Sequence, residues 1–269
     1  MWNRTCKEFN GIIPCNELKY SPIGNCNECQ FPRPYDERIL IIKLGAKGDV
    51  IRSLSILKPL RKKHKNAFIT WLVEEQNKGA IVNQKIDRIL TLNPETLLRL
   101  EIEQFDHVYN LEYDVPATAI TRKVQAKQKH GFYLDDLGLP GAYLKEGQYF
   151  LDINFSDKIN KRNTKTYQQM IFEALGFVYN KDDYKLEIDK AYKQQFMEKN
   201  NIYPEDKVIG INLGTAKRWP SKAWKKEFII DLIKKLPYKV LVLAGPHEIT
   251  LQEEILSQTN AITNNPLNT

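Results

Sequence analysis

From about residue 38 onward, the chain alternates between apolar runs and amphipathic stretches. Residues 38–44 form a near-continuous apolar run, which is typical of a strand buried on both faces of a parallel sheet. A glycine-containing loop at 45–49 follows, and apolar residues then recur at helical spacing over 50–63. Pro59 lies inside this stretch and should kink or shorten the helix. A strand, a glycine loop and a helix in this order are typical of a nucleotide-binding unit.

The same alternation continues along the chain and predicts an α/β fold. Further strands are expected at 68–73, 86–92, 105–111, 208–213 and 239–244. Helices are expected at 117–129, 164–175, 190–199, 223–236 and 251–257, and 131–149 is expected to be an irregular loop over a substrate cleft. Strands that alternate with helices indicate doubly wound domains.

These elements divide the sequence into three parts. Residues 1–35 are predicted to form a small cysteine-rich knuckle, and residues 36–185 an N-terminal Rossmann-like domain. Residues 186–269 are predicted to form part of a second Rossmann-like domain. This second domain is expected to be incomplete, because two parallel strands with one intervening helix do not make a Rossmann fold.

All four cysteines lie near the start of the chain and predict a metal site. They are Cys6, Cys15, Cys26 and Cys29, and the last two form a tight C-x-x-C pair. No apolar leader precedes them, so the chain is expected in the reducing cytoplasm, where zinc is favoured over disulfides. Four thiolates form a closed, structural zinc site. A redox dithiol at Cys26 and Cys29, an iron–sulfur cluster and buried free cysteines stay open as alternatives.

The formal net charge of +7 favours anionic partners such as nucleotides, phosphorylated lipid headgroups or nucleic acid. No apolar run approaches the ~20 residues of a membrane-spanning helix. A cytoplasmic protein is therefore expected, and its basic surface allows peripheral contact with the inner membrane. A zinc-containing nucleic-acid binder is a weaker alternative, because no predicted strand interleaves aromatic and basic residues.

Four sequence motifs occur in order between about residues 39 and 247. The first, 39–51, is an apolar strand, a small-residue loop and Gly-Asp-Val. The second is the strand 68–73, which ends in Trp-Leu-Val, and the fourth is the Gly-Pro-x-Glu turn at 245–248. The third, 209–224, contains Gly214, Trp219-Pro220, Lys222 and Trp224. Together these motifs resemble glycosyltransferase family 9, the heptosyltransferases of bacterial lipopolysaccharide core assembly.

The resemblance implies a GT-B fold, in which two Rossmann-like domains face each other across a cleft. The N-terminal domain would receive a lipid-linked or oligosaccharide acceptor, and the C-terminal one would hold an ADP-heptose-like nucleotide sugar. It implies neither a catalytic metal nor a nucleic-acid partner. The family's Gly-Asp-Thr/Ser-x-x-x-His motif, which holds the donor phosphates, does not occur in this sequence. A truncated, non-catalytic binding protein is therefore an alternative to an active transferase. The cysteine-rich segment lies outside the standard family pattern.

The family reaction is an inverting single displacement, which needs a base for the acceptor hydroxyl and positive potential for the leaving diphosphate. Asp49 is the candidate base, because it follows the first strand at the cleft edge of the sheet. The alternative is that Asp49 caps the following helix, a position that favours aspartate. Gly45 and Gly48 would let the backbone pass close to the substrate.

Four more residues are candidates for donor binding. Thr215 and Lys217 precede a helix, where a hydroxyl, an ammonium and free N–H groups converge on phosphate, and Lys222 matches the family lysine. Glu248 would accept hydrogen bonds from the ribose or adenine side, with helix capping as the alternative. No role is assigned to His64, His107 and His130, because they are scattered along the sequence without the spacing of metal ligands.

Overall fold

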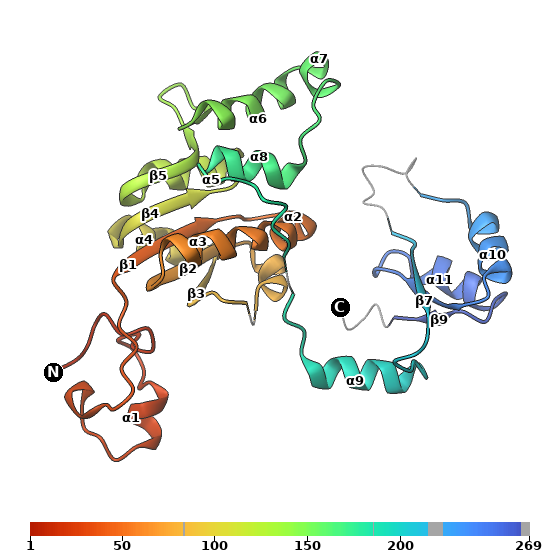
Figure 1. The fold of residues 1–269 in the computed structure, drawn as a ribbon, viewed down its shortest axis with the longest axis horizontal. Coiled ribbons are helices and arrows are strands. Elements are labelled where there is room, and N and C mark those ends of the chain that lie inside the picture. Colours follow the sequence, from red (N-terminus) through yellow and green to blue (C-terminus); the bar gives the residue numbers. More distant parts are fainter. Residues whose placement is uncertain (83, 185, 215–222, 265–269) are drawn as a thin grey trace. The chain divides into compact units, whose positions relative to one another are not determined.

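The computed structural model describes residues 1–82, 84–184, 186–214 and 223–264 (Figure 1). It divides the chain into two compact units, Met1–Glu187 and Ile188–Thr269, and each is described here by itself.

The first unit is built on a mixed six-stranded sheet with the strand order β3-β2-β1-β4-β5-β6 (Figure 1). Neighbouring strands from β3 to β5 are parallel, and only the pairing of β5 with β6 is antiparallel. The first four strands confirm the predicted ones to within two or three residues. The strands are β1 (Glu37–Ile42), β2 (Ala67–Val73), β3 (Arg88–Thr91), β4 (Gln104–Asn110), β5 (Gln125–Leu134) and β6 (Pro140–Ala142).

Helices cover both faces of this sheet, as the continuous apolar character of β1 requires. Ile39 and Ile41 pack into one core with residues of α2, α3, α6 and α8, and Leu40 and Ile42 pack into the other with residues of α4 and α5. The helices are α2 (Lys47–Ser53), α3 (Leu57–Lys63), α4 (Pro94–Ile102), α5 (Val115–Lys123), α6 (Lys145–Phe155), α7 (Asp157–Asn160) and α8 (Tyr167–Ala174), and a 3₁₀ segment spans Glu75–Ala80.

Short polar side chains fix where several helices begin. The side chain of Asn93 accepts a hydrogen bond from the Thr96 N–H at 2.8 Å, and that of Asp114 accepts one from the Ala117 N–H at 3.0 Å. Thr166 caps α8 in the same way. Each satisfies a backbone donor that the first helical turn leaves without a partner.

The helix predicted at 50–63 is divided into two. A 3₁₀ turn at Leu54–Ile56 separates α2 from α3. Pro59 has no N–H to donate to the carbonyl group of Ser55, so a regular α-helical ladder cannot continue through this point. The expected effect of Pro59 is therefore confirmed.

The helix predicted at 117–129 is confirmed only up to Lys123, and the loop predicted at 131–149 is wrong. α5 ends at Lys123, β5 covers Gln125–Leu134, and β6 and α6 follow where a loop was expected. The first half of β5 is rich in lysine and glutamine, which favour helices, and most of its side chains are exposed. Backbone pairing with β4 overrides this local preference.

Gly131 allows β5 to pass close to β4. Its φ is +89°, and a Cβ atom there would lie 1.8 Å from the carbonyl oxygen of Asn110. We expect Gly131→Ala to lower the free energy of unfolding by about 2–5 kcal/mol, from left-handed backbone strain and overpacking together. Gly138 is a matched control, since its φ is +76° but no atom would lie within 4 Å of the added Cβ. Equal losses for both variants in denaturant unfolding would contradict the close-approach argument.

The second unit has a three-stranded parallel sheet with the order β7-β8-β9. Its elements are α9 (Lys190–Lys199), β7 (Val208–Asn212), α10 (Lys226–Lys235), β8 (Lys239–Leu243), α11 (Ile249–Leu256) and β9 (Ile262–Thr263). Ile229, Ile230 and Ile233 place the apolar face of α10 in a core with Val240 and Val242 of β8. β9 has only two residues, too few for a periodic signal, and the sequence did not predict it.

Polar contacts join the cysteine-rich N-terminal segment to the rest of the first unit. This segment contains a short helix, α1 (Asn16–Tyr20), and a 3₁₀ turn at Cys26–Glu28. The Lys7 ammonium donates to the carbonyl of Ala67 at 2.7 Å and pairs with Asp87 at 3.2 Å. Asp87 also pairs with the Arg61 guanidinium at 2.6 Å and accepts from the Ile69 N–H at 2.8 Å.

These contacts make stability depend on pH. Burial alone would raise the pKa of Asp87, but the Ile69 N–H and the Arg61 guanidinium outweigh burial and hold the pKa below 3.8. In the same way, Arg88, Arg38 and Arg99 hold the pKa of Glu103 below 4.5 against the effect of burial. Because both pKa values are lower in the folded state, the stabilisation is present above about pH 4.5 and is lost as the pH falls below about 4.

We therefore expect the denaturant midpoint of the protein to fall between about pH 5 and about pH 2. Asp87→Asn should make this fall less steep, because one depressed pKa is removed. An unchanged pH slope in that variant would show that Asp87 does not contribute.

Candidate functional site

Asp49 lies just past the carboxyl end of β1, in the first turn of α2. Ala46 occupies the N-cap position of this helix, and the Asp49 N–H donates to the Ala46 carbonyl at 2.8 Å. The alternative that Asp49 caps the helix is therefore wrong, because Asp49 is a residue of the helix itself. Its carboxylate is about one-third exposed (37%) and pairs with the Arg52 guanidinium at 2.7 Å. A carboxylate held in this way is fixed in orientation and still reaches solvent.

Arg52 connects Asp49 to Tyr167 at the start of α8. The guanidinium carbon of Arg52 lies 3.5 Å from the centre of the Tyr167 ring, in a cation–π contact. Burial and the charge of Asp49 raise the pKa of the Tyr167 hydroxyl well above its ordinary value, so this tyrosine stays neutral. The sequence did not single out Arg52, and it did not predict the contact between Arg52 and Tyr167. The spacing of Arg52, three after Asp49, was the one available signal, and Tyr167 is distant along the chain.

A buried ion pair between Lys43 and Glu112 fixes the loop between β1 and α2. The Lys43 ammonium lies 2.5 Å from the Glu112 carboxylate, and their side chains are 4% and 10% exposed. Glu112 also accepts from the N–H groups of Leu44 at 2.6 Å and Gly45 at 3.3 Å, and Lys43 also donates to the Gly45 carbonyl. Burial raises the pKa of Glu112 although Lys43 opposes this. One carboxylate thus fixes the backbone that leads to Asp49.

The other side of this loop is closed by Asn77 and Glu74. The Asn77 amide donates to the Leu44 carbonyl at 2.9 Å. A Cβ atom on Gly45 would lie 3.1 Å from a Glu74 carboxylate oxygen and 3.3 Å from the Asn77 amide nitrogen. The structure therefore gives Gly45 a packing role. Gly48 is exposed on α2 and has no atom within 4 Å of an added Cβ, so its surface is open.

In the second unit, Glu248 lies where β7 and β8 end. Its carboxylate accepts a hydrogen bond from the Gly245 N–H at 3.1 Å, and a Cβ on Gly214 would lie 3.2 Å from it. Glu248 occupies the N-cap position of α11, but its side chain makes no capping hydrogen bond to that helix. The structure thus brings Gly214, Gly245 and Glu248 together at the carboxyl edge of the second sheet. Thr215, Lys217 and Lys222 lie outside the described residues.

The four cysteines are all free and half-buried. The Arg33 N–H lies 3.5 Å from the Cys6 sulfur. Thiolates suit zinc chemically, but within the described ranges the one group of three or more clustered ligand side chains does not include a cysteine. The predicted zinc site at Cys6, Cys15, Cys26 and Cys29 therefore stays a prediction.

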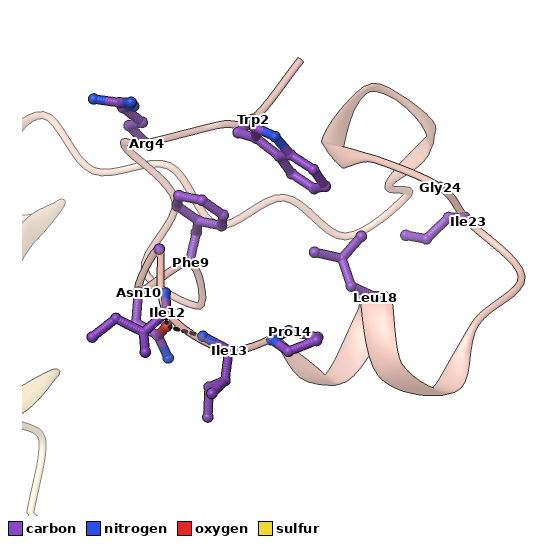
Figure 2. Close-up of a pocket in the computed structure, with 11 residues that line it drawn as sticks. Trp2, Arg4, Phe9, Asn10, Ile12, Ile13, Pro14, Leu18, Ile23 and Gly24 are labelled. Carbon is purple, nitrogen blue, oxygen red and sulfur yellow. Dashed lines mark hydrogen bonds between the residues drawn. The ribbon is translucent and has the colours of Figure 1, made fainter.

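The same N-terminal segment forms an open hollow of about 770 Å³. Apolar side chains line it, among them Trp2, Phe9, Ile13 and Leu18, with Arg4 at one side (Figure 2). Two of its lining residues, Ile12 and Ile13, are largely exposed. Within the described part of the chain, no helix has the length and apolar character needed to cross a membrane.

Comparison with known proteins identifies the family. The sequence model of glycosyltransferase family 9 (heptosyltransferase) matches residues 97–267. The chain is 26% identical over 191 residues to lipopolysaccharide heptosyltransferase 1 of Campylobacter coli, an alignment that covers 66% of this chain and 55% of that protein. The chain thus spans about half the length of this curated relative.

Solved structures show the same fold. The glycosyl transferase family 9 protein of Veillonella parvula matches with a TM-score of 0.65 and 20% identity, over 87% of this chain and 70% of that one. The ADP-heptose lps heptosyltransferase II of E. coli matches with a TM-score of 0.59 and 17% identity, over 84% and 72%. Because the family model covers more than half of the sequence, the chain belongs to glycosyltransferase family 9 (heptosyltransferase).

Proposed function

We propose that this protein transfers a heptose or a related sugar from an ADP-heptose-like nucleotide sugar to a lipopolysaccharide-type acceptor. The observation that carries this proposal is the Asp49 carboxylate, which is partly exposed and oriented by Arg52 at the carboxyl edge of a parallel sheet. Ligands of open α/β sheets bind at this edge. Family membership supplies the class of reaction.

In the proposed reaction Asp49 acts as general base. Arg52 contacts Oδ1 of Asp49, which leaves Oδ2 to take the proton from an acceptor hydroxyl. The acceptor oxygen forms a bond to the anomeric carbon as the bond from that carbon to the diphosphate breaks. The bonding electrons leave with the nucleoside diphosphate, and the configuration of the sugar inverts. Lys43 and Glu112 are positioning residues, because they act through the loop and not on the substrate.

We assign nucleotide binding to the second unit. Glu248 offers a carboxylate acceptor for ribose hydroxyls. This carboxylate lies close against Gly214 and Gly245, where added Cβ atoms would come within 3.2 and 2.9 Å of it. Lys217 and Lys222 are proposed to neutralise the diphosphate, and the Thr215 hydroxyl to donate a hydrogen bond to it. The family resemblance implies this role for Lys222. The cleft between two facing domains stays a prediction of that resemblance.

The test is a transfer assay with the purified chain. We expect ADP release and an acceptor mass increased by one heptose when ADP-heptose is incubated with lipopolysaccharide that lacks heptose. Reactions without acceptor, and with UDP- or GDP-linked sugars, are the controls. Binding of ADP-heptose without any transfer would instead support the non-catalytic alternative.

Two further sequence predictions belong to this proposal. Zinc at the four cysteines predicts about one metal equivalent that thiol-blocking reagents release, and elemental analysis measures it. The net charge of +7 and the apolar side chains of the N-terminal segment predict salt-sensitive co-sedimentation with anionic vesicles. Full recovery of the chain in the supernatant at low salt would exclude that contact.

A further inference from the structure

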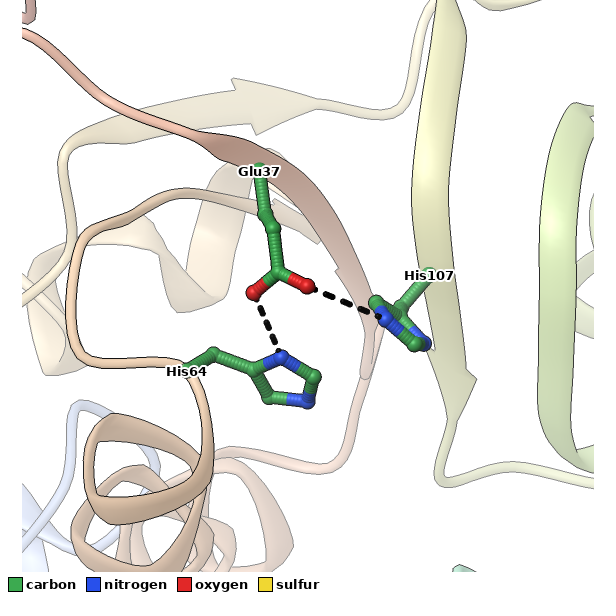
Figure 3. Close-up of side chains that lie close together, drawn as sticks. All are labelled: Glu37, His64 and His107. Atoms are coloured by element: carbon green, nitrogen blue, oxygen red, sulfur yellow. Dashed lines mark hydrogen bonds and ion pairs between the residues drawn. The ribbon is translucent and has the colours of Figure 1, made fainter.

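Three of the four histidines gather near the amino ends of the strands in the first unit, away from Asp49. His64 directly follows α3, His107 lies in β4 and His130 in β5. Glu37, the first residue of β1, places its carboxylate between His64 and His107 (Figure 3). The parallel register of β1 with β4 brings these residues together.

The potential ligand atoms of Glu37, His64 and His107 all lie within 4.8 Å of one another. Nδ1 of His64 is 2.7 Å from one oxygen of Glu37, and Nε2 of His107 is 3.6 Å from the other (Figure 3). The two imidazole rings are 4.5 Å apart between centres. Two imidazole nitrogens and one carboxylate therefore face a common point.

A hydrogen-bond network alone accounts for only part of this arrangement. The contact between His64 and Glu37 is a good hydrogen bond, but 3.6 Å from His107 to Glu37 is too long for one. In the described chain, Nε2 of His107 has no other hydrogen-bond partner, and this side chain is only 12% exposed. A ring nitrogen that points at a carboxylate without bonding to it, on a largely buried side chain, leaves a position for a cation.

In each of the two histidines, the ring nitrogen that points away from Glu37 (the outer nitrogen) lies near a polar partner, as is usual for metal-binding histidines. Nε2 of His64 lies 3.0 Å from the Tyr109 hydroxyl, and Nδ1 of His107 lies 3.4 Å from Nε2 of His130. When these outer nitrogens donate, the inner nitrogens keep their lone pairs for a metal. His64 is 4% exposed and Glu37 37%, so the site is closed on one side and reached from the other.

We propose that Glu37, His64 and His107 bind a divalent transition-metal ion of the zinc type. Two imidazoles and one carboxylate are a ligand set for such ions, and a water molecule on the open side completes the coordination. Binding replaces the hydrogen bond between His64 and Glu37 and releases its proton. The ion crosslinks the start of β1, the end of α3 and β4. It is separate from the cysteine segment and takes no part in sugar transfer.

The test is a titration of the EDTA-treated full chain with Co²⁺ and then Zn²⁺. In the variant with Cys26 and Cys29 both replaced by serine, which disables the predicted cysteine site, we expect visible Co²⁺ bands that Zn²⁺ displaces. These bands should lack the near-ultraviolet band of thiolate ligation. His107→Gln should weaken Co²⁺ binding at this site by about 100-fold or more.

Two further variants keep the test independent of folding defects. Glu37 is partly exposed, so Glu37→Gln should fold normally. In the background with Cys26 and Cys29 replaced by serine, it should lose the rise in Tm that Zn²⁺ gives when Glu37 is intact. His247→Gln is the matched control, because His247 is exposed in the second unit and should bind Co²⁺ like the wild type. Unchanged Co²⁺ affinity in His107→Gln and Glu37→Gln, or bands of thiolate ligation alone, would overturn the proposal.

Discussion

Replacing Asp49 by asparagine is expected to lower kcat for sugar transfer by roughly 10²–10⁴-fold, the usual contribution of a general base. Asparagine keeps the size of the side chain but cannot take a proton from the acceptor hydroxyl. Since Asp49 is partly exposed, the variant should fold normally. Initial rates at saturating donor and acceptor measure the effect, and the KM values should change little.

Asp136→Asn is the matched control for this experiment. Asp136 is an exposed carboxylate near the turn between β5 and β6, and it also pairs with an arginine, Arg122, at 2.5 Å. We expect wild-type rates from it, because it lies outside the site. If Asp49→Asn transferred sugar as fast as the wild type, Asp49 would not be the base.

The second large effect concerns stability. Glu112→Ala is expected to lower the free energy of unfolding of the first unit by about 3–5 kcal/mol, because the Lys43 ammonium stays buried without its carboxylate. The N–H of Leu44 would lose its acceptor as well. Denaturant unfolding followed by tryptophan fluorescence measures the loss, since Trp71 is buried in this unit.

A double variant separates the charge from the packing. Lys43→Met with Glu112→Leu removes both charges and keeps apolar volume, so much of the stability should return, as it does for other buried ion pairs. Transfer activity should not return to the same degree, because the N–H groups of Leu44 and Gly45 still lack their acceptor. A double variant that is less stable than Glu112→Ala would contradict this explanation.

The sequence predicts the parts of the fold that have strong local periodicity. The strand at 38–44 and the glycine loop after it follow from an uninterrupted apolar run, and they place Asp49 at the sheet edge. β5 was not predicted, because its polar first half pairs through its backbone and leaves most of its side chains in solvent. β9 is too short to produce a pattern.

The contacts around the site depend on pairs that are distant in sequence. Lys43 and Glu112 meet because β1 and β4 are neighbours, and strand order cannot be read from periodicity. The same register brings His107 beside Glu37, although the histidines showed no ligand spacing along the chain. The motif resemblance made Asp49 and Glu248 candidate site residues, but it did not point to the residues that hold them in place.

The most direct test of the proposed reaction is the anomeric configuration of the product. If Asp49 deprotonates an acceptor hydroxyl that attacks the donor in one step, proton NMR of the product should show the heptose with the opposite configuration to that in ADP-heptose. A product that retains the donor configuration would require a different mechanism and would contradict this account.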